Sequence, residues 1–267
     1  MARHHLKDRA VLTISGLEAK DFLANLITCA LPSPSELHFG ALLTPQGKIL
    51  HEFFILGLED GFQLDCLADQ RDALLKRLMF YRLRAKVDLA PADLSVFSSF
   101  VEGEDGFADP RHKDMGWRIF GEPREDDGDD APYHAHRIAL GLAELGRDFM
   151  PETTFPHEVS MDLTGGVDFQ KGCYVGQEVV SRMQHRGTAR SRFLIVNGEA
   201  LPDQGTPILA GDRTIGTMGS HVGSTGLAIM RLDRLSKALD EGDRVSAEDG
   251  PTLTFSTLPL DGFPWPA

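Results

Sequence analysis

The sequence predicts an α+β fold that ends in a small β-barrel, and three patterns support this prediction. The first is a helix after the short strand 11–14, with apolar residues at helical spacing. These residues are Leu17, Phe22, Leu23, Leu26 and Ile27. The second is a hairpin over 39–56, where two apolar runs flank a turn with Pro45 and Gly47. The third is the segment 190–257, whose short alternating runs are separated by glycine turns, as in small all-β barrels.

The remaining elements follow from the same patterns. We expect a strand at 62–67 and then a helix that Asp69 caps and that ends near Arg84, with Leu74, Leu75, Leu78 and Met79 facing inward. Further strands are expected at 94–100 and 117–120, and further helices at 131–142, after 176 and at 232–239. The chain therefore reads as an α+β region to residue 187, followed by the barrel.

Composition and charge exclude several classes of function. Hydrophobic residues make up 42% of the chain and charged residues 25%, which is ordinary for a soluble globular protein. The net charge of −13 disfavours a general affinity for nucleic acid, which needs a basic face. No apolar run approaches the roughly 20 residues of a membrane helix. Residues 1–16 lack the apolar core of a signal peptide. We therefore expect a cytoplasmic protein with no membrane partner.

The cysteines and histidines do not form a metal-binding pattern. Cys29, Cys66 and Cys173 are far apart, odd in number and without a CxxC pair, which disfavours both a structural zinc site and a disulfide scaffold. His134 and His136 flank one alanine with no supporting carboxylate or cysteine pattern, so we expect them on a helix surface. No permanently bound metal is predicted.

The stretch 164–187 holds the densest group of chemically capable side chains, set among glycines. Gly172 and Gly176 bracket Cys173, and a helix-compatible run follows, so Cys173 is expected on a tight loop before a helix N-terminus. The partial positive charge of a helix start and the ammonium of Lys171 both favour a thiolate. Cys173 is therefore the candidate reactive residue, tuned by Lys171. The alternative is a small buried cysteine with a structural role.

The run KGCYVGQE at 171–178, followed by basic residues, resembles the signature of the YgfZ family. Members are folate-binding proteins related to the T-protein (GcvT) of the glycine cleavage system, and they assist iron–sulfur cluster assembly or repair. Five other stretches occur in the family's usual order: TPQGKIL, YRLRAKV, DPR, GWR and HRIALGLAELGRD. The resemblance implies a T-protein-like cloverleaf of mixed α/β subdomains around a central folate hole. Residues 1–187 would form two interwoven subdomains and 188–267 the C-terminal barrel. It also implies a link to tRNA modification.

The implied cofactor is tetrahydrofolate or a one-carbon derivative. Folate has a flat pterin, an aromatic ring and an anionic tail, so its site should offer aromatic walls, polar edges and cations. Candidates for stacking are Tyr174 and Phe169. Candidates for the pterin edge and the pocket wall are Gln177, Glu178 and Glu158, and candidates for the tail are Lys171, Arg182, Arg186, Arg82 and Arg84.

Three functions of different kinds fit these observations. The first is a folate-dependent factor for iron–sulfur cluster assembly or repair that uses Cys173, with iron–sulfur enzymes or cluster carriers as transient partners. A resident cluster is not predicted, because a single chain that holds one usually supplies several thiolates. Another is a non-catalytic folate-binding scaffold in which Cys173 has a structural role.

The remaining function of the three is that of a T-protein-like aminomethyltransferase. That family uses an acidic pair after a glycine turn, and the matching positions here are His51 and Glu52, so one acid is missing. The glutamate expected after Arg-Ile is replaced by Ala139. These departures disfavour the transferase, and we do not expect a conventional enzyme.

Overall fold

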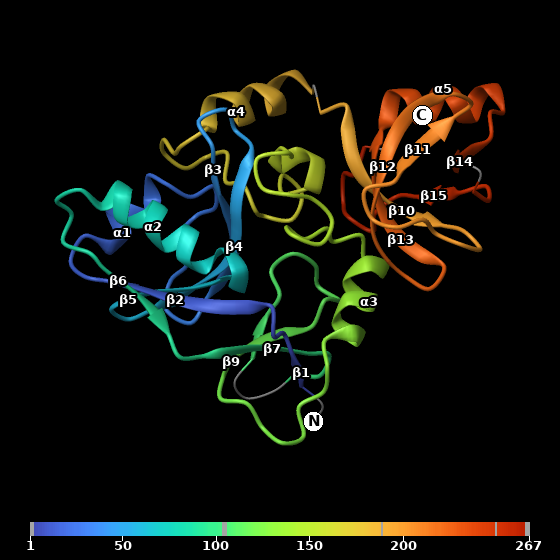
Figure 1. The fold of residues 1–267 in the computed structure, drawn as a ribbon. Coiled ribbons are helices and arrows are strands. Elements are labelled where there is room, and N and C mark those ends of the chain that lie inside the picture. Colours follow the sequence, from blue (N-terminus) through green and yellow to red (C-terminus); the bar gives the residue numbers. More distant parts are fainter. Residues whose placement is uncertain (1–2, 103–105, 188, 249, 265–267) are drawn as a thin grey trace.

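The computed structural model describes residues 3–102, 106–187, 189–248 and 250–264. These residues form three lobes, each built on one antiparallel sheet, as Figure 1 shows. The lobes meet near the middle of the molecule, and the long connection from the second lobe to the last carries α4 (Gln177–Arg186). The arrangement confirms the predicted α+β cloverleaf with a C-terminal barrel.

The first lobe is a five-stranded sheet with strand order β3-β4-β5-β2-β6. Its strands are β2 (Arg9–Ser15), β3 (Leu37–Leu43), β4 (Ile49–Leu58), β5 (Gly61–Leu67) and β6 (Asp88–Ala92). The predicted hairpin is confirmed as β3 and β4, and Gly47 supplies the positive φ of 82° that its turn needs.

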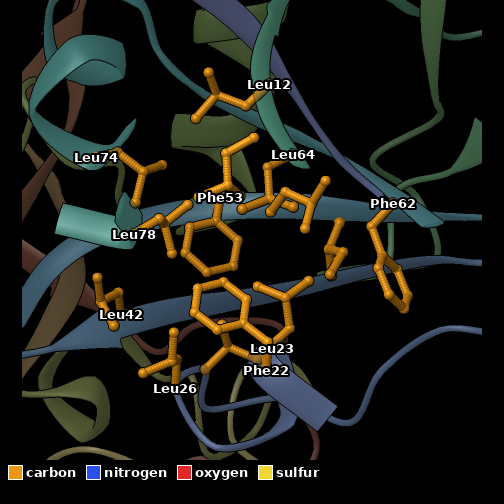
Figure 2. Packing of buried hydrophobic residues seen from close by; sticks show 14 of the residues in the cluster. Leu12, Phe22, Leu23, Leu26, Leu42, Phe53, Phe62, Leu64, Leu74 and Leu78 are labelled. Atoms are coloured by element: carbon orange, nitrogen blue, oxygen red, sulfur yellow. The ribbon is translucent and has the colours of Figure 1, made fainter. Parts of the chain in front are cut away.

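Helices α1 (Ala19–Ala24) and α2 (Arg71–Arg82) cover one face of this sheet, with the short 3₁₀ turn η1 (Ala68–Gln70) before α2. Figure 2 shows Leu74 and Leu78 of α2 packed over Phe53 and its neighbours. Burying such a leucine contributes about 1.5–3 kcal/mol. The expectation that Met79 faces inward is wrong, because the helix turns Met79 towards solvent while Leu74 and Leu78 fill the inner face.

The second lobe is a four-stranded sheet of order β1-β7-β9-β8. Its strands are β1 (His4–His5), β7 (Ser95–Ser99), β8 (Gly106–Ala108) and β9 (Trp117–Gly121). Helix α3 (Ala131–Ala139) follows and packs against the barrel. It ends three residues before the predicted position 142.

The third lobe is a six-stranded sheet of order β14-β11-β12-β13-β10-β15, closed by α5 (Leu232–Glu241). Its strands are β10 (Ser191–Asn197), β11 (Pro207–Ala210), β12 (Arg213–Val222), β13 (Thr225–Arg231), β14 (Val245–Ala247) and β15 (Thr254–Ser256). Leu235 and Ala238 of α5 fill the apolar core of this lobe.

A second apolar cluster ties the lobes together. It lies on the other face of the first sheet, where Phe39 and Phe54 meet Phe149 and the barrel residues Phe193 and Leu227. The 3₁₀ turn η2 (Pro156–Val159) and α4 lie beside this cluster. The segment 164–187 is thereby held against both the first lobe and the barrel.

Candidate functional site

The Cys173 loop sits directly before α4, as the glycine pattern predicted. Gly176 precedes the helix with a φ of 82°, and a Cβ at this position would lie 2.6 Å from the carbonyl oxygen of Thr44. Only glycine meets both demands without strain. The β3–β4 turn therefore packs against the start of α4. Through this contact, the TPQGKIL stretch supports the KGCYVGQE stretch.

The three cysteines differ sharply in exposure. Cys29 and Cys66 are buried, and burial raises the pKa of each thiol to about 12. Cys173 is exposed, and a Cβ at the neighbouring Gly172 would meet no atom within 4 Å. Cys173 therefore carries the accessible thiol of this chain, with open space beside it.

Lys171 anchors the loop. Its ammonium donates hydrogen bonds to the carbonyl oxygens of Ile27 at 2.6 Å and Cys29 at 2.9 Å. Burial lowers the pKa of Lys171. The carboxylate of Asp168 accepts the backbone N–H groups of Gln170 and Lys171. These contacts give Lys171 a positioning role towards the segment 27–29, and the tuning of Cys173 by Lys171 stays a prediction.

The aromatic candidates for folate stacking lie mostly inside the protein. Tyr174 is buried in the second apolar cluster, and its hydroxyl has no partner among the described residues. Burial raises its pKa to about 12, and the ammonium of Lys171 lies 5.4 Å from its ring centroid. Phe169 is half-buried against the ring of His157, at 6.0 Å between centroids. Glu158 is engaged at the start of η2, where its carboxylate accepts the N–H of Phe155 at 2.8 Å.

The charged candidates lie on the surface. Glu178, Arg182 and Arg186 are exposed on one face of α4, because residues four apart in a helix lie above one another. Gln177 makes a long hydrogen bond of 3.5 Å from its amide to the carbonyl of Gly172. Arg84 is exposed beyond the end of α2, on a different element. The structure thus groups the α4 residues, and the folate contacts stay predictions.

A network of buried ion pairs occupies the region where the lobes meet, and sequence reasoning missed it. Asp65 of β5 accepts from Arg9 at 2.7 Å and also from Arg118 of β9. The guanidiniums of Arg118 and Arg111 lie 3.7 and 4.8 Å from the ring centroid of Phe54, which they flank as cation–π partners. The first and second sheets are joined through these charges.

The network continues through α3 to the barrel. Tyr133 donates to Glu144, which also pairs with Arg111 at 2.9 Å. Arg137 pairs with Asp148 at 2.6 Å, and Asp148 accepts from the hydroxyl of Ser220 in β12 at 2.6 Å. Burial alone would raise the pKa of Glu144, but the guanidiniums of Arg137 and Arg111 hold it well below its usual value.

Three of the stretches quoted above supply most of this network. Asp109 and Arg111 come from DPR, Arg118 from GWR, and Arg137, Glu144 and Asp148 from HRIALGLAELGRD. Clustered charges in otherwise apolar stretches were the available signal. Their partners lie in other lobes, so the pairing was not visible in the sequence.

His51 and Glu52 point to opposite faces of β4. His51 contacts the amide oxygen of Gln70 at 3.1 Å, and burial lowers its pKa to about 4. Glu52 accepts the N–H of Leu145 at 2.8 Å, and its second carboxylate oxygen has no partner among the described residues. Burial, followed by the nearby Glu144, raises the pKa of Glu52 to about 7. The two residues therefore do not form one acid–base pair.

One group of side chains has the spacing of metal ligands. Ligand atoms of Asp8, Asp130 and His134 lie within 4.8 Å of one another. The guanidinium of Arg147 donates to Asp8 at 2.8 Å and lies 3.3 Å from Asp130, so a positive charge already balances these carboxylates. His134 is buried, and the expectation of a surface position for it is wrong because α3 turns it inward beside Arg137. No described helix is long and apolar enough to cross a membrane.

Comparison with known proteins gives one family match and a set of relatives. Residues 190–257 match the C-terminal beta-barrel domain of CAF17. The human iron-sulfur cluster assembly factor IBA57, mitochondrial, is 30% identical over 97% of this chain and 84% of its own length. The IBA57 homolog of Pyricularia oryzae is 29% identical over 95% of this chain and 78% of its own. The mouse IBA57 is 30% identical over 88% and 78%.

Among solved structures, the glycine cleavage system aminomethyltransferase T from Bartonella henselae is similar in fold. The TM-score is 0.73 with 15% identity, over 97% of this chain and 85% of that one. This likeness confirms the predicted T-protein-like fold. The cytoplasmic location expected from the sequence is wrong, because the named relatives are mitochondrial proteins. The finer resemblance to the YgfZ family, the folate and the link to tRNA modification stay predictions.

Proposed function

This chain belongs to the family of the IBA57 iron–sulfur cluster assembly factors, and on that premise we propose that it supports the assembly or repair of iron–sulfur clusters in other proteins. The observation that carries the proposal is the contrast among its thiols. Cys173 is exposed on a loop fixed by Lys171 and Gly176, while Cys29 and Cys66 are buried.

The proposed chemistry uses Cys173 as a transient ligand or sulfur carrier. A cluster usually takes about four protein ligands. One accessible thiol can supply one of them, so the other ligands must come from a partner protein. The cluster is then cargo that passes at the Cys173 loop. Lys171 and the β3–β4 turn hold the loop in place, and the open flank at Gly172 leaves room for the partner.

The test compares the wild type with Cys173→Ser in cells that lack this protein. We expect the variant to fold normally and to lose support of a cluster-dependent enzyme. A matched control is Ser181→Ala on the neighbouring helix α4, which should keep full support. Full activity of Cys173→Ser would refute the proposed role. Rapid labelling of one thiol in the native wild type distinguishes this function from a scaffold with an inert Cys173.

Tetrahydrofolate or a one-carbon derivative is the second element of the proposal, and it derives from the sequence resemblance. The exposed cations of α4 offer a place for the anionic tail. Calorimetry with tetrahydrofolate should show binding to the wild type and weaker binding to Arg182→Ala combined with Arg186→Ala. An unchanged affinity in this double variant would remove the tail site from α4.

The aminomethyltransferase alternative is less well supported. The likeness to the aminomethyltransferase is one of fold alone at 15% identity, and His51 and Glu52 face opposite sides of β4. We expect no turnover of an aminomethyl-lipoyl carrier with tetrahydrofolate. Clear turnover that Glu52→Gln abolishes would reverse this choice.

A further inference from the structure

The outer side of α2 carries an exposed stripe that the proposed chemistry does not use. Its members follow one another at spacings of three or four residues and so share one side of the helix. They are Ala73, Lys76, Arg77, Phe80 and, just past the helix end, Leu83 and Arg84. Phe80 is 72% exposed and Leu83 is 86% exposed, and they lie three residues apart on the same side, where clustered exposed apolar residues mark interaction sites. We call this set the α2 stripe.

The α2 stripe is basic in an acidic protein. Residues 71–86 contain six basic residues and one acidic residue, whereas the whole chain has a net charge of −13. Within the described parts of the chain, no ion pair engages Lys76, Arg77 or Arg84. A stabilising role at the helix C-terminus accounts for the last turn only, because the helix dipole acts over about one turn. Lys76 and Arg77 lie further back.

The backbone at the end of α2 is held in an unfavourable conformation. Leu83 has a φ of 46°, in the left-handed region that favours glycine. Such a conformation is unfavourable for a residue other than glycine, and residues held in it cluster at functional sites. Here it directs a leucine into solvent. Further along the stripe, a hollow of about 410 Å³ is lined by Ala73, Lys76, Arg77 and Phe80.

The α2 stripe and the Cys173 loop rest on the same core. Leu74 and Leu78, on the inner side of α2, belong to the apolar cluster of Figure 2. Val175, two residues after Cys173, packs against that cluster as well. A partner that contacts α2 would therefore bind to an element whose packing is continuous with the loop.

We propose that the α2 stripe is the docking surface for an acidic protein that inserts an apolar side chain beside Phe80 while it exchanges a cluster at Cys173. This inference rests on the proposed function. The cations select an acidic surface, and the apolar residues supply the contact that persists in salt. A stripe of one 12-residue helix is small for a stable complex, so the association is transient, as delivery requires.

A protein fits the stripe better than a membrane surface does. A helix that lies in a bilayer interface presents a continuous apolar face opposite a polar one. On α2, the apolar residues Phe80 and Leu83 alternate with cations along one stripe, and the opposite side is buried in the core. The hollow beside Phe80 is shallow and open, so a side chain of a protein can lie against the Phe80 ring there.

The first experiment places a photo-crosslinking amino acid at Phe80 of the full chain, in cells that normally make the protein. The matched control carries it at Leu239 of α5, an apolar residue that is 48% exposed. We expect an adduct with an acidic protein that has cluster-ligating cysteines, from position 80 and not from position 239. The same adducts from both positions, or none from position 80, would overturn the proposal.

The second experiment reverses charge with Arg77→Glu combined with Arg84→Glu. The control is Arg213→Glu combined with Lys237→Glu on the barrel lobe, where both residues are exposed. We expect the crosslinked yield from position 80 to fall roughly tenfold in the α2 variant and to stay level in the control. Support of the cluster enzyme should fall with it, while labelling of Cys173 stays normal. An unchanged yield and unchanged support would overturn the proposal.

The result separates this inference from the function on which it rests. If Cys173→Ser loses support and the α2 variant keeps it, the docking surface is wrong and the function stands. If Cys173→Ser keeps support, the function itself fails. A membrane is the alternative occupant of the α2 stripe. It would be indicated if the wild type gave no protein adduct but floated with vesicles containing phosphatidylserine in a salt-sensitive way, and if the α2 variant did not float.

Discussion

The buried ion-pair network at the centre of the molecule and its exposed surface, which we call the rim and which includes Cys173 and Arg77, use charge in opposite ways. At the centre, Asp65, Arg118 and Glu144 are buried and each has a partner of opposite charge. At the rim, Cys173 and Arg77 are exposed, and no ion pair of the described residues engages Arg77. The contrast shows that the charged motifs of this sequence divide into those that hold the lobes together and those that face solvent.

The largest expected effect comes from breaking the centre. Asp65→Ala would leave Arg9 and Arg118 buried without their shared carboxylate. We expect the free energy of unfolding to fall by about 3–5 kcal/mol, the usual cost of an uncompensated buried charge. Denaturant unfolding measures it. Asp72→Ala on α2, whose side chain is exposed, is the control and should cost little. A loss under about 1 kcal/mol for Asp65→Ala would contradict the structural role of the network.

A smaller effect is expected at Glu52, where the centre is incompletely paired. Its pKa is raised to about 7 in the folded protein from an ordinary value of 4.5. The folded state therefore holds this proton more tightly, and stability is lost as the pH rises from about 4.5 through 7. Glu52→Gln should be more stable than the wild type by about 1–3 kcal/mol at pH 8 and equal to it near pH 4. Urea unfolding across this pH range tests it, and parallel curves for the two proteins would contradict the burial of a protonated Glu52.

A still smaller effect is expected at Lys171, which is half-buried two residues before Cys173. Lys171→Met keeps the length of the side chain but loses the hydrogen bonds to the carbonyls of Ile27 and Cys29. We expect a loss of about 1–2 kcal/mol in unfolding free energy and a changed rate of Cys173 labelling, because the loop loses its anchor. Labelling kinetics identical to those of the wild type would show that Gly176 and the β3–β4 turn hold the loop unaided.

The smallest effect on stability is expected at the rim itself. Cys173→Ser should change the unfolding free energy by less than about 0.5 kcal/mol, as is usual for exposed positions. The native wild type should react at one thiol, and the two buried thiols should react only after unfolding. Counting labelled thiols before and after denaturant checks both statements. Fast reaction of two or more thiols in the native protein would erase the contrast between Cys173 and the others.

Local sequence patterns predicted those elements that are determined by interactions between residues close together in the chain. The β3–β4 hairpin, the body of helix α2, the barrel strands and the loop position of Cys173 followed from periodicity and glycine spacing. The predicted cap of α2 was wrong, because Asp69 lies in the 3₁₀ turn before the helix and Gln70 precedes α2 without a side-chain cap. The site could be predicted as far as its most accessible thiol. The anchoring of Lys171 could not, because its partners lie about 140 positions earlier in the chain.

The centre was out of reach for a related reason. His134 was expected on a helix surface, and the burial of Asp109 and Arg111 was not predicted. Each becomes buried only when lobes far apart in the sequence come together, and a charge pattern does not reveal which carboxylate meets which guanidinium. The helix rotation that exposes Met79 likewise depends on how Leu74 and Leu78 fit the sheet.

The chain of contacts from Asp65 through Arg118, Tyr133, Glu144, Arg137 and Asp148 to Ser220 touches all three sheets. Its consequence is cooperativity. If the barrel came away, Arg137 would lose its contact with Ser220, and the apolar cluster that joins Phe149 to Phe193 would open to water. Because detaching the barrel is so unfavourable, the three lobes of the intact protein should unfold together in one calorimetric transition rather than three. The barrel should not unfold separately from the other two lobes.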